Sequence, residues 1–161
     1  MATDIAMSDY LEIRNLAFEW AESYDNKDWD RLRRCLAPSI CLDFRSLRGE
    51  LHDNLNPDEY AAILSSSKLL GDQELKTQHL LGGAKWTQLS DGTVQVAHQL
   101  RVAHQRYTDK SLTTVANKGH GHGVVTHSYK KVDGAWKIAA VVPQLAWSEY
   151  DLFGTLNPEK H

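Results

Sequence analysis

Long alternating segments dominate the chain between Leu75 and Val142, where apolar and polar residues take turns at the period of a β-strand. The pattern predicts strands over residues 75–89, 93–107, 115–132 and 136–142, with Gly82-Gly83 as a candidate break in the first. The dipeptides at 91–92 and 133–134 are both Asp-Gly, a turn signal of antiparallel hairpins. A large, mostly antiparallel sheet is therefore expected, and Pro143 is expected to end it.

The part of the chain before this sheet has the period of a helix instead. Apolar side chains share one face of a helix predicted over residues 8–24: Ile13, Leu16, Ala17, Trp20 and Tyr24. Asp28 is a plausible cap of a second, short helix that Pro38 stops, and residues 40–45 alternate like a strand.

A third helix is predicted to start at the run Asn56-Pro57-Asp58-Glu59, which has a cap, a proline at the first helical position and a capping-box glutamate. Helices that precede long strands are typical of an α+β fold. We expect one domain over residues 1–161, in which a cone-shaped, curved, mixed or antiparallel sheet wraps around the N-terminal helices. Such a cone encloses a cavity where a ligand can bind. The apolar tail, about residues 145–161, is expected to pack back as a lid.

Composition and charge exclude several classes of function. The 161 residues carry a net charge of −3 with both signs interspersed, so neither nucleic acid nor an anionic membrane is an expected partner. No apolar run reaches the roughly 18 residues that membrane insertion needs. Residues 1–8 do not resemble a signal peptide, and Cys35 and Cys41 are expected to be free thiols, so a cytoplasmic location is predicted.

Several polar residues fall on faces that should be buried. In the segment 93–107, His98 and His104 share the apolar face with valines, where a histidine is more often a satisfied core residue than a catalytic one. Asp25, beside the apolar stripe of the first helix, would be costly to bury without a partner. It is therefore either exposed to solvent or paired with a histidine.

The run His120-Gly121-His122 places two imidazoles on one strand face, a spacing that metal sites use. His127 has the opposite parity, and no acidic residue or cysteine nearby offers a third ligand. We expect no functional metal, and expect these histidines to pack between aromatic side chains or at a subunit interface.

Four stretches of the sequence together resemble the scytalone dehydratase family. They are residues 19–32 (EWAESYDNKDWDRL), residues 77–83 with Thr77-Gln78-His79 and Gly82-Gly83, residues 100–107 (LRVAHQRY) and residues 118–122 (KGHGH). The resemblance runs in register from about Ser8 to Asp151. It implies the nuclear-transport-factor-2-like cone fold, a homotrimer, no cofactor, and removal of water from a small aromatic polyketide.

The same resemblance implies roles for individual residues. Tyr24 matches a phenol that holds a water against the substrate carbonyl, Asp25 a carboxylate that orients a catalytic histidine, here His104, and His79 the second imidazole. Val102 and Leu152 match apolar walls and the lid.

The chain departs from the family pattern at three pocket positions. Phe44 stands where the family has a second tyrosine, and Gly123 and Val125 stand where it has a serine and an asparagine. All three changes remove polar contacts, which discriminate strongly between substrates. We therefore expect a wider, more apolar pocket that prefers a reduced anthraquinone or anthrone to a melanin-type naphthalene. Decarboxylation, cyclisation or isomerisation of a polyketide, and non-catalytic ligand binding, are the alternatives.

Overall fold

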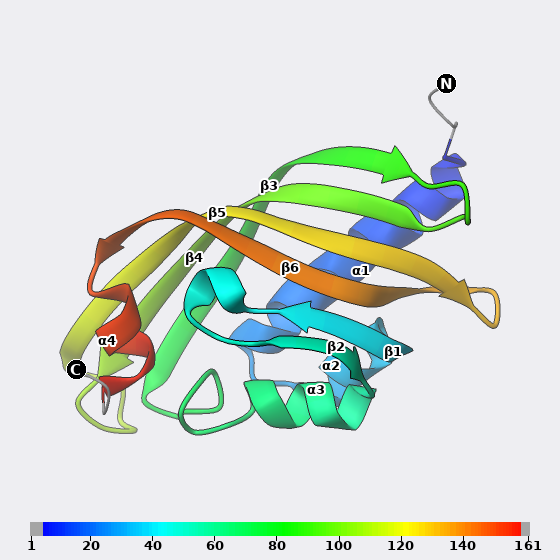
Figure 1. Cartoon of the computed structure of the whole chain (residues 1–161). Helices are drawn as coiled ribbons and strands as arrows, with labels where there is room; N and C mark the ends of the chain where they lie inside the picture. The colour runs from blue at the N-terminus through cyan, green and yellow to red at the C-terminus, as the bar shows by residue number, and fades with distance from the viewer. Residues whose placement is uncertain (1–4, 159–161) are drawn as a thin grey trace.

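A six-stranded sheet curves over the helices in the computed structural model, which describes residues 5–158 (Figure 1). The elements follow in the order α1 (Met7–Asp25), α2 (Trp29–Cys35), β1 (Leu36–Asp43), η1 (Arg45–Leu47), β2 (Leu51–Leu55), α3 (Pro57–Leu64), β3 (Leu75–Gln88), β4 (Val94–Tyr107), β5 (Val115–Val132), β6 (Ala135–Tyr150) and α4 (Leu152–Leu156). The predicted α+β class is confirmed.

The sheet is mixed, with the strand order β2-β1-β6-β5-β4-β3. All neighbouring strands run antiparallel except β1 and β6, which are parallel. Gly92 and Gly134 adopt positive φ angles of 83° and 84° in the two predicted hairpin turns, a conformation that glycine takes without steric cost. The predicted break in β3 is a shift of register between Leu81 and Ala84.

The helices begin where the sequence places their caps. The Asp28 side chain accepts from the backbone N–H of Arg31, and Asn56 and Glu59 form a complete capping box at the start of α3. α1 packs against the inner side of the sheet, while α2 and α3 lie under β1 and β2 (Figure 1). The core lies between these layers and includes Trp20, Leu32, Leu64 and Ile138.

Two boundary predictions are wrong, and one strand was not predicted. β1 already begins at Leu36, so Pro38 lies inside a strand, and β2 was not foreseen. β6 continues through Pro143 to Tyr150, so the predicted tail is sheet up to that point and turns back only as α4. Pro143 is tolerated because its carbonyl points to the Ser46 hydroxyl, at 2.7 Å, and not to β5. In an extended strand the missing N–H lies on the same side, so no ladder bond to β5 is lost.

Both cysteines are free thiols, as expected. Within residues 5–158, no helix has the length and apolar character needed to cross a membrane. The cytoplasmic location stays a prediction from sequence alone.

Candidate active site

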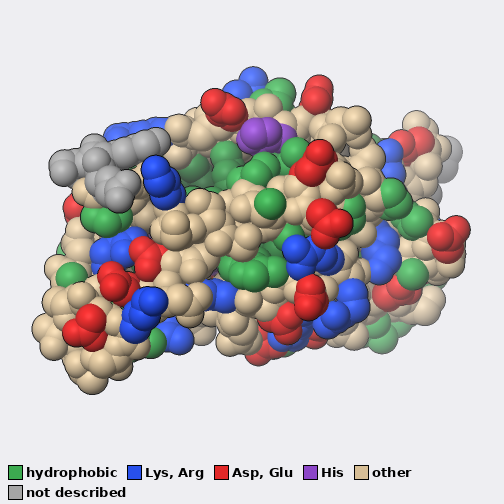
Figure 2. All heavy atoms as spheres, turned by 90° about the horizontal axis from the view of Figure 1, so that it is seen from below, with side chains coloured by type: hydrophobic (Ala, Val, Ile, Leu, Met, Phe, Trp, Pro, Cys, Tyr) green, Lys and Arg blue, Asp and Glu red, His purple; other side chains and the backbone are tan. Residues whose placement is uncertain are grey.

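A cavity of about 740 Å³ lies between the inner face of the sheet, α1, the segment after α3, and α4. From below, Figure 2 shows a hollow in this face with hydrophobic side chains inside it and charged side chains around its rim. All but one of the nine site residues proposed from the sequence line the cavity: Tyr24, Phe44, His79, Val102, His104, Gly123, Val125 and Leu152. The exception is Asp25, which lies behind His79.

Asp25 holds His79 and not His104, which corrects the sequence-based pairing. Its carboxylate accepts the backbone N–H of His79 at 2.9 Å and lies 2.7 Å from the ring Nδ1, and the Thr77 hydroxyl donates to it at 2.9 Å. β3 is the edge strand of the sheet, so the outward N–H of His79 has no strand partner. The C-terminal end of α1 meets this edge and supplies the acceptor. The sequence indicated Thr77 only as part of a motif and did not predict that its hydroxyl would contact Asp25.

The second imidazole has a different environment. Nδ1 of His104 lies 3.2 Å from the Gly119 carbonyl, which can only accept, so Nδ1 carries the proton and Nε2 is left as an acceptor. Burial, and secondarily the nearby His79, lowers the pKa of His104 to about 3. At neutral pH this ring is therefore uncharged and able to accept a proton.

The two imidazoles face the same cavity, with ring centroids 6.4 Å apart. His79 is backed by the Asp25 carboxylate, whereas His104 is backed by the neutral Gly119 carbonyl. Neighbouring titratable groups in unlike environments are what acid–base catalysis needs, because one can give a proton while the other takes one.

Tyr24 lies next to His79 with its ring edge-on to the imidazole, at 5.1 Å between centroids. Its hydroxyl is 2.5 Å from the hydroxyl of Tyr60 on α3, a residue that sequence analysis did not single out. Burial raises the pKa of Tyr60 to about 12 and also raises the pKa of Tyr24 above its ordinary value, so both phenols keep their protons.

The walls of the cavity are mainly apolar, but two positions differ from expectation. Residues 40–45 were predicted to alternate as one strand, yet β1 ends at Asp43, and Phe44 caps the following η1. It still reaches the cavity. A Cβ at Gly123 would lie 2.0 Å from the Gln144 carbonyl oxygen, where the β5–β6 register shifts. The glycine thus accommodates the bulged backbone of β6, and does not simply widen the pocket.

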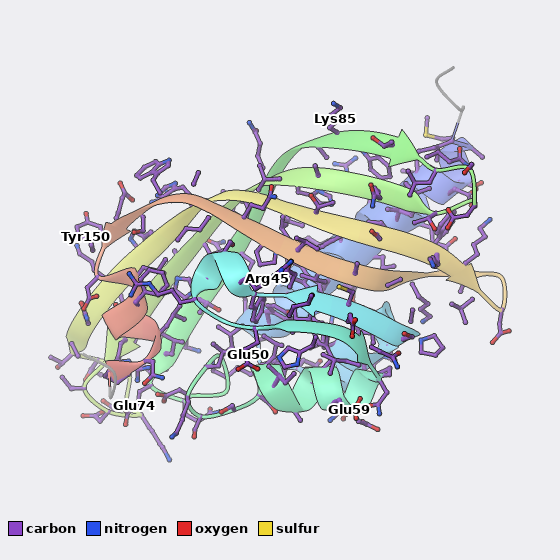
Figure 3. The ribbon with its side chains drawn as sticks, in the orientation of Figure 1. Arg45, Glu50, Glu59, Glu74, Lys85 and Tyr150 are labelled. Atoms are coloured by element: carbon purple, nitrogen blue, oxygen red, sulfur yellow. The ribbon has the colours of Figure 1, made fainter. Side chains whose placement is uncertain are left out.

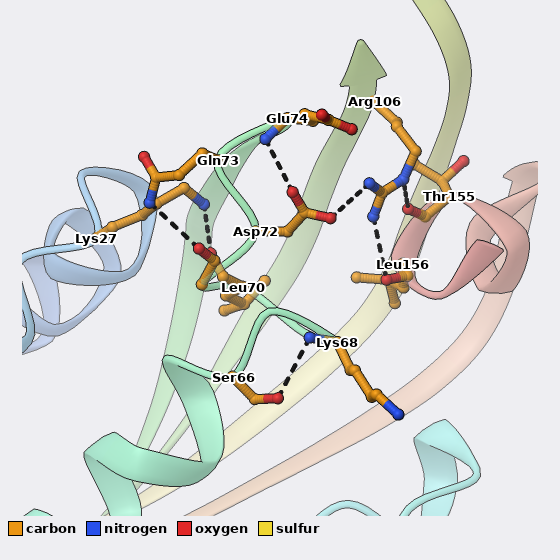
Figure 4. A network of polar contacts seen from close by, with 11 residues as sticks. Lys27, Ser66, Lys68, Leu70, Asp72, Gln73, Glu74, Arg106, Thr155 and Leu156 are labelled. Carbon is orange, nitrogen blue, oxygen red and sulfur yellow. Dashed lines mark hydrogen bonds and ion pairs between the residues drawn. The ribbon is translucent and has the colours of Figure 1, made fainter. Parts of the chain in front are cut away.

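Arg106 on β4 binds both α4 and the segment between α3 and β3, two parts of the chain that border the cavity (Figure 4). Its guanidinium donates to Asp72 at 2.6 Å, in the segment between α3 and β3, and to the backbone carbonyls of Thr155 and Leu156 at 2.8 and 3.4 Å. The arginine is 7% exposed, so these contacts lie in a largely desolvated setting. Its inward position at the end of β4 joins α4 to the loop opposite.

Three further histidines of β5 pack against aromatic rings. His122 stacks on Trp147 with 3.7 Å between ring centroids and bonds Glu149 at 3.1 Å, and His120 lies edge-on to Tyr150. His127 is fully buried against Tyr129 and Trp20. Within residues 5–158, no group of three or more His, Cys, Asp or Glu side chains could hold a metal ion.

The arrangement of sheet, helices and cavity defines the class of protein. A solved structure from Kribbella flavida has a TM-score of 0.75 at 20% identity, over 90% of this chain and 95% of that one. Identity at this level shows the fold alone, the nuclear-transport-factor-2-like cone.

Sequence comparison then narrows the class. The scytalone dehydratase family model matches residues 4–160. The chain is 49% identical over 150 residues to a scytalone dehydratase of Colletotrichum orbiculare, covering 93% of this chain and 80% of the relative. It is 44% identical over 151 residues to a protein named dehydratase AgnL8 of Paecilomyces divaricatus, covering 94% and 87%. The chain belongs to the scytalone dehydratase family, and these fungal relatives indicate a dehydratase.

Proposed function

We propose that the protein removes water from a hydroxylated, partly reduced polyketide ring ketone, without a cofactor, by histidine-based acid–base catalysis. The observation that carries the proposal is the pair of imidazoles on one cavity, one backed by Asp25 and the other by the Gly119 carbonyl. Dehydration beside a ring carbonyl needs a base, an acid and a donor to the carbonyl oxygen, and these are the groups at hand.

In the proposed reaction, Nε2 of His104 removes the proton alpha to the carbonyl, and the electron pair moves to the carbonyl oxygen. Tyr24, directly or through a water, donates a hydrogen bond to that oxygen. His79, held by Asp25, gives a proton to the departing hydroxyl as the C–O bond breaks. The enolate electron pair returns at the same time, so the carbonyl is restored and the new C=C bond forms. Water leaves, and transfer of a proton from His104 back to His79 restores the starting state. Groups of this kind each contribute about 10²- to 10⁴-fold.

We propose a ring system larger than a naphthalene as the substrate, and the size and apolar lining of the cavity support this proposal. The cavity has a volume of about 740 Å³, within the roughly 300–1,000 Å³ of small-molecule sites. Phe44, Val102 and Val125 give it apolar walls. An anthraquinone- or anthrone-type ketone fits this lining better than a compact, polar naphthalenone does.

We also propose a homotrimer assembled through the outer face of the sheet. Large apolar side chains are exposed there, including Leu80, Trp147 and Tyr150 at 57%, 55% and 66%. Figure 3 labels Tyr150 and Lys85 on the side of the sheet that faces away from α3. Exposed aromatic groups of this size are typical of protein interfaces. Sedimentation should give a species of three chains, and a monomer of 18.2 kDa would refute the assembly.

The function is tested by incubating the purified protein with scytalone and, in parallel, with a reduced hydroxyanthraquinone, and measuring the product masses by mass spectrometry. Loss of 18 mass units, faster with the larger ring, is the expected result. His104→Gln, which removes the base, should abolish it. Loss of 44 mass units would indicate decarboxylation, an unchanged mass with a new compound would indicate cyclisation or isomerisation, and binding without conversion would indicate a carrier.

A further inference from the structure

Tyr60 is a second phenol directly behind Tyr24. The two hydroxyl oxygens are 2.5 Å apart, and both side chains are buried. Tyr24 lines the cavity, whereas Tyr60 does not. Any effect of Tyr60 on a bound molecule must therefore pass through Tyr24.

The position of Tyr60 is fixed by the start of α3. The capping box at Asn56 and Glu59 and the proline at the first helical position set the helix rigidly, and Tyr60 follows at once. Tyr60 is 0% exposed, and a buried hydroxyl is costly unless it is hydrogen-bonded. Tyr24 supplies the partner.

Counting protons gives the direction of this bond. Each phenol has one proton to donate and can also accept. If Tyr24 donated to Tyr60, the Tyr60 proton would need another acceptor. Within residues 5–158 the Tyr60 hydroxyl has no acceptor besides Tyr24, because the Trp20 indole N–H, its other neighbour, can only donate. If Tyr60 donates to Tyr24, the Tyr60 proton has an acceptor and the buried Tyr60 hydroxyl is hydrogen-bonded. The Tyr24 proton is then free to point into the cavity.

We propose that Tyr60 is a positioning residue: it donates its hydroxyl to Tyr24 and so directs the Tyr24 proton at the carbonyl oxygen of the substrate. This inference deepens the proposed function and rests on it. As negative charge grows on the carbonyl oxygen, Tyr24 donates more strongly and its own oxygen becomes a better acceptor. Hydrogen bonds in such a chain strengthen one another. Because Phe44 carries no hydroxyl, this phenol pair supplies the donor from the α1 and α3 side.

The test compares Tyr60→Phe with Tyr129→Phe. Tyr129 is also fully buried, and among the described residues its hydroxyl bonds only His127, so its loss reports the general effect of removing a buried phenol hydroxyl. We expect Tyr60→Phe to lower kcat about tenfold, the equivalent of one hydrogen bond, with KM little changed. Tyr129→Phe should leave kcat within about twofold. Tyr24→Phe should lose about 10²-fold, and adding Tyr60→Phe to it should cost nothing more. Equal effects of the Tyr60 and Tyr129 variants, or additive losses in the double variant, would overturn the proposal.

A second measurement separates this inference from the proposed reaction. 1-Tetralone is a ring ketone with no hydroxyl to lose, and its bound C=O stretching frequency reports the hydrogen bond that it receives. The frequency should be lowered in the wild type and in Tyr129→Phe, and should rise in Tyr60→Phe. If these frequencies are observed but the protein dehydrates none of the substrates, the proposed function is refuted, while the role of Tyr60 in directing the Tyr24 proton still holds. A further lowering in Tyr60→Phe would mean that Tyr24 donates to Tyr60, and an unshifted carbonyl in the wild type would mean that the Tyr24 proton does not face the cavity. Either result overturns the inference.

Discussion

The Asp25 carboxylate contacts His79 twice: one oxygen lies 2.7 Å from the ring Nδ1, and the other accepts the backbone N–H at 2.9 Å. A carboxylate that binds both the ring and the backbone of one residue fixes the orientation of the imidazole. Since Nδ1 is occupied, Nε2 is the nitrogen that can serve the cavity. The acid of the proposed reaction is therefore His79, and His104 is the base.

Asp25→Asn should lower kcat about 10²- to 10⁴-fold, because the amide cannot stabilise a charged His79 and allows the wrong tautomer. Thr77→Val is the matched control. It removes only the hydroxyl that donates to the same carboxylate, at 2.9 Å, and should cost about tenfold or less. Steady-state kinetics with the substrate found by product analysis would measure both. A larger loss from Thr77→Val than from Asp25→Asn would contradict this assignment.

Buried neutral histidines should make the fold sensitive to mild acid. Burial lowers the pKa of His98 to about 4, as it lowers the pKa of His104 to about 3. Both folded-state values lie below the unfolded value of about 6.5, so the unfolded chain binds more protons. Stability is fully present above about pH 6.5 and falls as pH drops toward 4, by about 1.4 kcal/mol per pH unit for each histidine.

Urea unfolding of the wild type between about pH 7.5 and 4.5 would measure this dependence. His98→Gln should flatten the slope, because one proton fewer is taken up on unfolding. An unchanged slope in this variant would show that other groups cause the acid sensitivity.

Arg106→Met should loosen α4 and the segment between α3 and β3 together. The substitution removes the ion pair with Asp72, whose side chain is 21% exposed, and the donor to the Thr155 and Leu156 carbonyls, at a cost of about 1–3 kcal/mol. We expect a lower Tm, faster proteolysis near α4, and a rise in KM larger than the fall in kcat. Arg33→Met is the control, since its ion pairs with Asp30 and Asp58 are exposed and should be worth less than about 1 kcal/mol. Equal destabilisation by both variants would contradict the role of Arg106.

Phe44→Tyr should do little for turnover of scytalone, because the walls at Val102 and Val125 stay apolar. It should impair the larger native substrate by placing a hydroxyl against an apolar surface, at a cost of about 1–3 kcal/mol. Parallel kcat/KM measurements on both substrates decide this. A roughly 10²-fold gain with scytalone would identify a scytalone site weakened at one donor. Gly123→Ser is unsuitable as a companion, because its Cβ would collide with the Gln144 carbonyl.

Local periodicity was enough to predict most of the elements. The register of apolar residues in α1, the capping box of α3 and the Asp-Gly turns depend on neighbours within a few positions, and the structure confirms each of them. The inward parity of His98 and His104 on β4 was correct for the same reason. The prediction that the sheet ends at Pro143 was wrong, because a proline interrupts a strand only when its missing N–H would have faced another strand. That depends on which element lies beside it, here η1 through Ser46.

The partners inside the site were decided by the tertiary structure alone. Sequence and resemblance together named eight of the residues that line the cavity, yet they assigned Asp25 to the wrong histidine and overlooked Tyr60. Both errors have the same physical cause. A hydrogen bond requires two atoms within about 3 Å, and residues 36 or 54 positions apart come that close only when whole elements dock. Periodicity says which way a side chain points, but the packing of α1 against the edge strand β3 and against α3 decided what it meets.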